Sequence, residues 1–491
     1  MDTKLTAPTN DPSLPSFVHP VLADLQEDLQ RAYDAFNYLR GVKMRYLPQE
    51  SAEPDDAYRQ RLDRAVFAGF FRDSVEAFAG ILSRFSLKDP PTTMETAIDN
   101  IDLEGNSLTA FWMWLDCLML RDGGCAICVE MPPDLPATAA EEAAQERRPY
   151  LVARQRSKVL NWRTTVDYGV ETIDQVTFLE AVEVPDSMFG IKSEPRYRVI
   201  TRGEWFVFKI DRDSSNQVRA TIVEQGTYIG ADGRPLPVVP VVWYGSEQAG
   251  FGHSGMPLRQ VVEHSLEHFQ VRSDLSEKTH RCAMPVPVRI GAAPPAPGDS
   301  RRKGLTLGPN TIIDLEPGGS FTFAEPSANS LREQREQIAD IEKLIARQTL
   351  GFLYGDPGGV KTATQAGLES AQTQAGITKL AQRKSSAMQA AMVIWCLYTG
   401  EQLEPGSGIQ MSNTIYDRPL EPQDIQTLQM LAGGAELISQ QTAIEELQRA
   451  GVIKATTSVE DEMARINAER PLPADDVGLN DYGALPADQE T

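Results

Sequence analysis

The sequence predicts an α+β protein, mainly helical, with more than one structural unit. Two observations carry this prediction: long stretches in which apolar residues recur every three or four positions, and a central stretch of short β-type runs separated by turn-forming clusters. The 491 residues suggest two to four structural units at about 100–200 residues each. With 41% hydrophobic residues, the chain is able to bury a large core.

The N-terminal part is predicted to be helical. Apolar residues recur at helical spacing over 18–45 and again over 58–85, and residues 111–120 (FWMWLDCLML) are apolar enough to form a buried helix. A Gly-containing break at 121–124 then leads into a strand over 125–131.

Residues 150–244 are predicted to form a mostly antiparallel sheet region, because short β-type runs alternate with turn clusters. The runs are 151–153, 175–184, 197–201, 204–210, 218–224 and 238–243.

The second half of the chain follows the order helix, β module, helix. Residues 256–281 are predicted to form a long amphipathic helix, with Pro257 in its first turn. A Pro/Gly-rich segment follows, and a second long helix begins at the capping box Ser330–Glu333 and runs to residue 350. The short strands expected between the two helices are 286–290, 311–315 and 321–323.

A Gly-rich stretch at 351–360 separates this helix from a third one, which runs from Thr362 to Trp395 or Tyr398. A lone strand is expected at 409–416. After it, a helical hairpin is expected from 422–450 and 458–468. The last 21 residues carry five acids and no base, which predicts disorder.

The charge of the chain argues against one class of function. The 47 Lys and Arg residues against 69 Asp and Glu residues give a net charge of −22, whereas proteins that hold nucleic acid tightly carry an excess of Lys and Arg. The acidity is uneven: residues 256–350 hold 12 basic and 12 acidic residues, and residues 351–420 hold five of each. Tight, static DNA binding is therefore excluded, but brief or local contact with DNA is not.

Two further patterns bear on where the protein works. Residues 1–17 lack a basic stretch followed by an apolar one, and nowhere do 18 apolar residues run together, so neither an export signal nor a membrane span is expected. Five cysteines in so long a chain cannot form a disulfide scaffold, which favours a reduced, intracellular setting.

One short motif resembles a metal site. His264, Glu267 and His268 match the H-x-x-E-H order of inverted zinc peptidases, and the spacing places both imidazoles on one helix face. No third ligand is defined, and the surrounding helix is rich in other charges. The favoured interpretation is a solvated or subunit-facing stripe, with a zinc site as the alternative.

Two other motifs are incomplete. Residues 355–362 approach a phosphate-binding loop, but Val360 stands where a glycine must let the backbone approach a phosphate. Cys125 and Cys128 form a C-x-x-C in a predicted strand, with no second pair at zinc-site spacing. No active site, metal site or cofactor is therefore predicted.

Local phrases along the chain resemble one family. They are Tyr46-Leu-Pro48, Tyr58-Arg-Gln-Arg61-Leu62, Arg64-Ala-Val-Phe67, Pro149-Tyr-Leu151, Asn161-Trp-Arg163, Pro240-Val-Val-Trp-Tyr-Gly245, Pro257-Leu258, and His268-Phe-Gln270 leading to Ser273-Asp274. Together with the order helix, β module, helix, Gly-rich loop and long helix, they resemble the portal proteins of tailed double-stranded-DNA bacteriophages. The resemblance is to a subgroup long catalogued as a domain of unknown function, and it runs from about residue 20 to 470.

The resemblance implies a portal-type fold with an α/β wing, a two-helix stem, a small α/β clip, a tunnel loop and a helical crown. By position, these are an N-terminal arm at 1–19, the first part of the wing at 20–255, stem helices at 256–281 and 327–350, the clip at 282–326, the tunnel loop at 351–362, a long helix and the second part of the wing at 363–420, the crown at 421–470 and an acidic disordered tail at 471–491. The C-terminal part is too small for an extended barrel.

The same resemblance implies a structural function. Portals of this family assemble as twelve-fold rings at one capsid vertex, and genomic DNA is packaged and ejected through the ring. The ring docks terminase and then the head–tail adaptor, and it meets the major capsid protein or scaffold. Portals are not enzymes and need no cofactor, because terminase hydrolyses ATP. The expected location is the virion, and the host cytoplasm during assembly, without membrane contact.

Basic residues near the tunnel loop are the candidates for contact with DNA, because a ring repeats each of them as a circle of positive charge. They are Lys361, Lys379, Arg383 and Lys384. At the tip of the predicted clip, the candidates for docking an acidic partner such as terminase or adaptor are Arg301, Arg302 and Lys303. Ordinary solvated charges remain the alternative at these positions.

Two other functions stay open. One is a zinc-dependent hydrolase that uses His264, Glu267 and His268. The other is a different structural head–tail connector protein, which the length of the chain disfavours.

Overall fold

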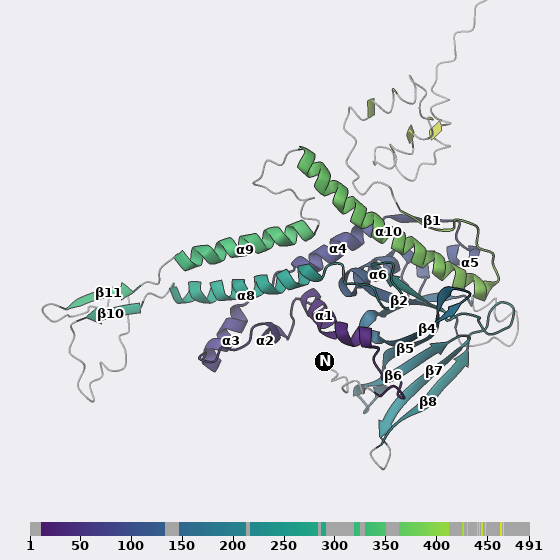
Figure 1. Cartoon of the computed structure of the whole chain (residues 1–491), viewed down its shortest axis with the longest axis horizontal. Helices are drawn as coiled ribbons and strands as arrows, with labels where there is room; N and C mark the ends of the chain where they lie inside the picture. Colours follow the sequence, from purple (N-terminus) through teal and green to yellow (C-terminus); the bar gives the residue numbers. More distant parts are fainter. Residues whose placement is uncertain are drawn as a thin grey trace, which may run out of the picture. The chain divides into compact units, whose positions relative to one another are not determined.

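The computed structural model describes residues 11–132, 147–212, 217–282, 286–290, 319–324, 329–349 and 363–411, with scattered residues between 425 and 465. The chain divides into two units, Met1–Ser412 and Asn413–Thr491, and the elements below belong to the first (Figure 1). The predicted tunnel loop and acidic tail, the predicted strand 311–315 and nearly all of the predicted crown lie outside the described residues.

Within the described residues, nine α-helices and several antiparallel sheets form a mixed α+β fold, in agreement with the predicted class. The helices are α1 Pro20–Phe36, α2 Lys43–Tyr46, α3 Asp55–Arg64, α4 Phe70–Leu82, α5 Thr92–Glu95, α6 Leu108–Asp122, α8 Arg259–Cys282, α9 Asn329–Gln348 and α10 Ala363–Thr399. None of the described helices carries an apolar stretch long enough to cross a membrane.

The single helix predicted over 18–45 is wrong, because the chain leaves the helix after Phe36. Tyr38 and Leu39 adopt left-handed φ angles of 56° and 54°, and helical structure resumes only at α2. The Leu39 side chain is nonetheless fully buried. Apolar periodicity therefore continues through a segment whose backbone is not helical.

The helix predicted over 58–85 is likewise two helices, α3 and α4, separated by residues 65–69. A Cβ placed on Gly69 would lie 2.7 Å from Cε1 of Tyr38, so this position admits only a glycine unless the Tyr38 ring moves. The break lets the two turns at 38 and 69 approach each other closely.

The strands that the structure describes form four sheets, each antiparallel throughout. The largest has the order β4-β5-β6-β7-β8, and a three-stranded sheet has the order β3-β2-β9. The strands are β1 Phe85–Lys88, β2 Gly124–Glu130, β3 Tyr150–Gln155, β4 Val159–Asp167, β5 Val170–Pro185, β6 Ile191–Thr201, β7 Glu204–Arg212, β8 Val218–Thr227, β9 Val241–Gly245, β10 Val286–Ile290, β11 Ser320–Ala324 and β12 Gly408–Met411.

Two features of the strands differ from the prediction. β4 was not expected, since its residues beyond Trp162 are polar except for the exposed Val166, and they show no clean alternation. The strand predicted at 409–416 is not alone, because β12 pairs with β1 in the register Phe85↔Met411.

The core is centred on α6, in which ten of 15 residues are buried. Such a helix is apolar on nearly all sides because other elements surround it. α6 packs against α4 and β2, and α10 lies on β9 and β12. Trp112 of α6, Trp395 of α10 and Tyr244 of β9 are fully buried within this core.

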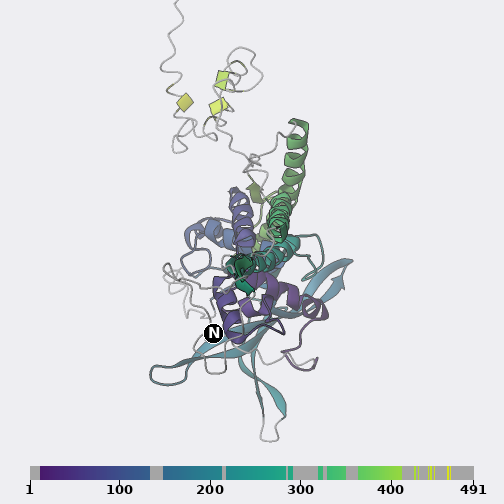
Figure 2. The same ribbon diagram turned by 90° about the vertical axis from the view of Figure 1, so that its left-hand side faces the viewer.

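The helices α8 and α9 lie side by side and are joined at their far end by the β10–β11 hairpin (Figure 1). Figure 2, which looks along these helices, shows the strands of the five-stranded sheet on one side of them and α10 on the other. The helix–β–helix order predicted for 256–350 is thereby confirmed for the described residues.

Candidate functional site

α8 is attached to the N-terminal helices at both of its ends. Arg259, at its first residue, pairs with Asp28 of α1 at 3.1 Å. Near the other end, Glu277 pairs with Arg64, the last residue of α3. Phe269, between them, is fully buried. These contacts hold α8 against α1 near its start and against α3 near its end.

The segment that enters α8 is held by a buried arginine. The Arg156 guanidinium donates to three backbone oxygens, those of Asp122 at 3.0 Å, Ser254 at 2.6 Å and Gly252 at 2.7 Å. Burial lowers the pKa of Arg156 to about 10, opposed by the charge of Asp122. The Arg156 guanidinium thus links the end of α6 to the loop before α8, because it donates hydrogen bonds to carbonyl oxygens of both segments.

α9 is covered mainly by α8. Ile341 and Ile345 are buried, whereas Leu344 between them is 40% exposed. Nε2 of His268 on α8 lies 3.1 Å from a carboxylate oxygen of Glu342 on α9. Most other described residues of α9 are half-buried or exposed. A single chain therefore leaves much of this long helix uncovered.

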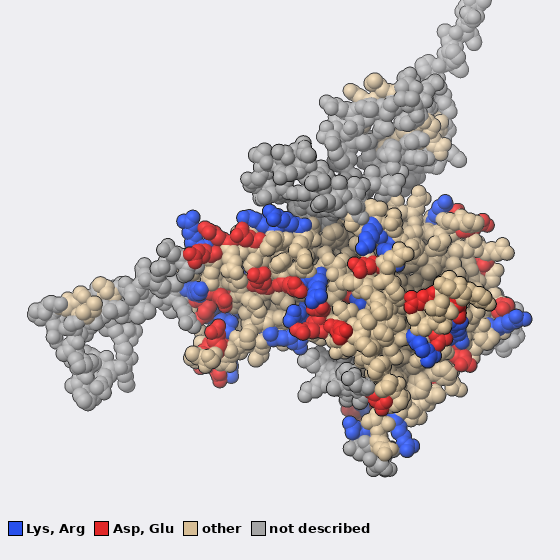
Figure 3. Space-filling model, viewed as in Figure 1, with Lys and Arg blue, Asp and Glu red and all other residues tan. Residues whose placement is uncertain are grey.

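The charges on the two helices are balanced. α8 and α9 each carry four Lys or Arg residues and four Asp or Glu residues. On α9, Arg332 pairs with Glu336 and Lys343 with Asp340, each at 3.0 Å. Figure 3 shows positive and negative side chains interspersed over this part of the molecule. The helix pair consequently presents little net charge.

Lys379 is exposed on α10, at a pocket of about 310 Å³ where α9 and α10 approach each other. Arg347 and Gln348 of α9 and Glu247 line the same pocket. Two cations and one carboxylate thus line one pocket, beside the C-terminal end of α9 and the middle of α10.

The other predicted site residues that the structure describes do not line this pocket. Arg383 is half-buried, and its charge opposes the large rise in the pKa of the buried Tyr244 hydroxyl. Lys361 and the three predicted clip residues Arg301, Arg302 and Lys303 lie outside the described residues.

The prediction that Lys384 contacts DNA is wrong, because its side chain is 0% exposed. Nζ of Lys384 donates to Oδ2 of Asp116 and to the backbone oxygen of Leu82, both at 2.7 Å. The hydroxyl of Tyr244 donates to Oδ1 of Asp116, also at 2.7 Å. Burial lowers the pKa of Lys384 and raises the pKa of Asp116, and each partner's charge opposes that effect.

This ion pair fastens α10 to α6 and β9 inside the core. The ammonium also lies 4.3 Å from the ring centroid of Phe85 and 5.4 Å from that of Trp112. The signal for it was present in the sequence as one acid, Asp116, inside the apolar run FWMWLDCLML. A buried acid demands a buried partner, but the sequence does not say which cation it is.

The H-x-x-E-H motif does not assemble a metal site in the described residues. His268 faces α9, where it contacts Glu342 and packs edge-on against the ring of Phe70 at 5.1 Å between centroids. His264 is half-buried and lies 3.4 Å from Glu267 of its own helix. Among the residues that the structure describes, no group of three or more His, Cys, Asp or Glu side chains could hold a metal.

The C-x-x-C motif lies in β2, where both thiols are buried and free. Burial raises the pKa of Cys128 to about 12 and raises that of Cys125 well above its usual range. Both residues pack as small apolar side chains in the three-stranded sheet β3-β2-β9.

Comparison with known proteins gives one family match. The model of a family described as "Domain of unknown function (DUF4055)" matches residues 257–399. The match spans α8, the β10–β11 hairpin, α9 and α10. No curated protein matches the chain.

Several solved structures that resemble the chain come from particles called gene transfer agents. One is a chain of the "Virion of native gene transfer agent (GTA) particle", with 15% identity over 82% of this chain and 95% of that chain and a TM-score of 0.42. Another comes from the "Neck of empty GTA particle computed with C6 symmetry", with the same identity and coverage and a TM-score of 0.43.

Proposed function

We propose that the chain is a portal-type subunit of a phage-like particle. Copies of it would form a ring at one capsid vertex, and genomic DNA would be packaged and ejected through the ring. The observation that supports the proposal most directly is the α8–hairpin–α9 unit followed by the 37-residue α10. This is the order of stem helix, clip, stem helix and long helix that the sequence resemblance implies. The family match at 257–399 covers the same elements.

The uncovered surface of α9 supports assembly into a ring. A 20-residue helix with few buried side chains gains little stability from its own chain, since most helix stability in proteins comes from packing of an apolar face. Neighbouring copies around a symmetry axis would supply that packing. We take the ring to be a dodecamer, with stem helices packed between neighbouring subunits.

The balanced charge of the helix pair suits a channel through which DNA moves. Each phosphate that a protein neutralises strengthens binding, and six to ten such contacts change the affinity by about 10³–10⁵ between 50 and 200 mM salt. A wall of that kind would hold DNA in place. Paired charges such as those of Arg332 with Glu336 leave the duplex free to slide.

The proposal assigns roles to the remaining candidate residues. Lys361, Lys379 and Arg383 would form sparse positive circles near the tunnel loop. Arg301, Arg302 and Lys303 would face terminase and then the adaptor at the clip. The major capsid protein or scaffold would meet the ring from outside, and no catalytic step or cofactor is assigned to the chain.

The alternative of a zinc hydrolase is disfavoured because His268 is held by Glu342.

Charge reversal at Lys379 tests the channel assignment. We expect assemblies of the Lys379→Glu chain to bind linear double-stranded DNA more weakly than wild-type assemblies. The plot of log K against log salt concentration should become shallower by about 0.9 for each phosphate that the variant no longer neutralises. Titration of labelled DNA at several salt concentrations measures both quantities.

The matched control is Lys192→Glu, which reverses an exposed lysine on β6 of the five-stranded sheet. This variant should leave the salt dependence at the wild-type value. An unchanged affinity and slope for Lys379→Glu, or equal effects of the two variants, would remove Lys379 from the channel wall.

A further inference from the structure

The turn between β5 and β6 presents two large apolar side chains to solvent. Met188 and Phe189 are 89% and 91% exposed. The turn is nonetheless well defined: the Asp186 N–H donates to the oxygen of Gly190 at 2.9 Å, and the Gly190 N–H donates to the Ser187 hydroxyl at 2.9 Å. Because the loop is ordered by its own hydrogen bonds, the two side chains project from a preformed tip.

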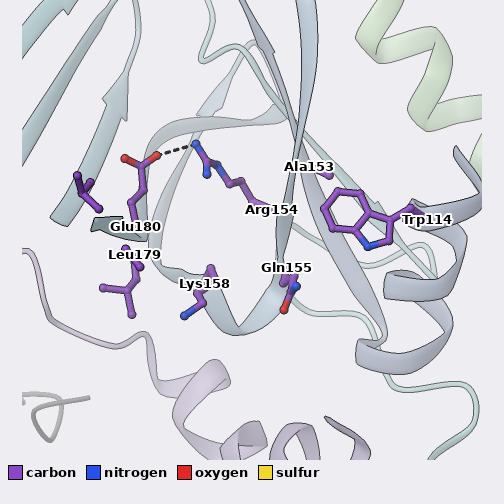
Figure 4. Close-up of a pocket in the computed structure, with 9 residues that line it drawn as sticks. Trp114, Ala153, Arg154, Gln155, Lys158, Leu179 and Glu180 are labelled. Atoms are coloured by element: carbon purple, nitrogen blue, oxygen red, sulfur yellow. Dashed lines mark hydrogen bonds and ion pairs between the residues drawn. The ribbon is translucent and has the colours of Figure 1, made fainter. Parts of the chain in front are cut away.

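A pocket of about 430 Å³ lies on another part of the same chain, between α6, β3 and β5 (Figure 4). Its apolar lining includes Leu179, Val182 and Trp114, and the Trp114 side chain is 45% exposed. The pocket has room for a large side chain from outside.

The charges of the pocket are complementary to those of the tip. Arg154 of the pocket is paired with Glu180 at 2.6 Å, whereas Lys158 has no ion-pair partner among the residues that the structure describes. The tip carries one exposed acid, Asp186, at the start of the turn. An incoming tip would bring a carboxylate to the unpaired ammonium.

The tip cannot fill the pocket of its own chain. β5 pairs with β6 as far as Pro185↔Ile191, which keeps the strand extended. An extended strand rises about 3.3 Å per residue, so Pro185 at the end of β5 lies roughly 10 Å along the strand from Val182, and Met188 lies beyond it in the turn. A tip that fills this pocket would therefore come from another molecule.

We propose that Met188 and Phe189 of one copy insert into the pocket of the next copy, with Asp186 facing Lys158. A projecting patch and a matching pocket at different places on one chain make a heterologous contact, which generates a ring when the rotation closes. This inference rests on the proposed ring and adds the contact that joins neighbouring wings. Large apolar tips at ring interfaces also explain why two such side chains remain exposed in a single chain.

Cross-linking between two differently tagged full-length chains tests the contact. One chain carries Phe189→Cys and the other Trp114→Cys, and the two are mixed, assembled and mildly oxidised. We expect a mixed-tag dimer on a non-reducing gel. The control replaces Phe189→Cys by Tyr168→Cys, which lies at the opposite end of β5 and is also fully exposed. This control also measures any cross-linking through the native cysteines, and it should give no mixed dimer above that background.

Two kinds of substitution test the contact without cysteine chemistry. One removes the apolar side chain of Phe189, and the other exchanges the charges of Lys158 and Asp186. Replacement of a central apolar anchor often weakens association about 30-fold or more, and we expect this of Phe189→Ser in mass photometry. Lys158→Glu should also weaken assembly, and Lys158→Glu combined with Asp186→Lys should restore it.

The outcomes separate this contact from the proposed function. Rings that form normally without the mixed cross-link, or with Phe189→Ser as stable as wild type, would overturn the tip–pocket contact alone. A wild-type chain that stays monomeric at every concentration would overturn the ring and this contact together.

Discussion

Replacing Asp116 by alanine is expected to lower the free energy of unfolding by about 3–5 kcal/mol, because the change leaves the Lys384 ammonium buried without its counter-charge. The remaining hydrogen bond to the oxygen of Leu82 cannot neutralise the charge. The Tyr244 hydroxyl also loses its acceptor in the fully buried core. The midpoint of urea unfolding of the full chain at pH 7 measures the loss.

Two variants show whether the buried pair is responsible. Glu76→Ala removes the partner of Arg72 on the surface of α4, where an exposed ion pair contributes about 0–1 kcal/mol, so stability should barely change. Replacing both partners, as Asp116→Leu with Lys384→Met, should recover most of the loss because no unpaired charge remains. An Asp116→Ala chain as stable as the Glu76→Ala chain would contradict this role of the pair.

The second large effect is expected at Arg156. Arg156→Met leaves three buried backbone oxygens without their donor, and each unsatisfied group costs about 1–3 kcal/mol. Two of these oxygens belong to Gly252 and Ser254, just before α8. We therefore expect a lower unfolding midpoint together with faster amide exchange in residues 252–262.

Arg163→Met is the control, since that guanidinium is 66% exposed and contacts Asp174 on the same five-stranded sheet. It should leave both readouts near the wild-type values. Wild-type exchange rates in residues 252–262 of Arg156→Met would show that the guanidinium does not hold the entry to α8.

Elements with strong, isolated signals could be predicted from the sequence. The capping box at Ser330–Glu333 and an uninterrupted apolar stripe placed the helix predicted at 327–350 within a few residues of α9, and α8 was placed equally well. The pattern succeeded there because each helix is continuous and keeps its apolar residues at helical spacing from end to end. Turns rich in Gly, Asp and Ser likewise separated most strands of the large sheet.

The failures have a common physical origin in tertiary packing. The segments 18–45 and 58–85 keep their apolar period across backbone breaks, since buried residues such as Leu39 serve the core without being helical. Lys384 looked like a surface lysine in an Ala/Gln-rich helix, and only the three-dimensional position of Asp116 assigns it to the core. Asp116 and Lys384 are 268 positions apart, so no local sequence pattern predicts that they form an ion pair.

Negative-stain imaging of the purified full-length chain tests the central claim most directly. A ring of copies around a central hole wide enough for duplex DNA, with twelve-fold symmetry in class averages, is the result that a portal-type subunit requires. A chain that remains monomeric at high concentration, or that forms only closed particles without a hole, would contradict the proposed function.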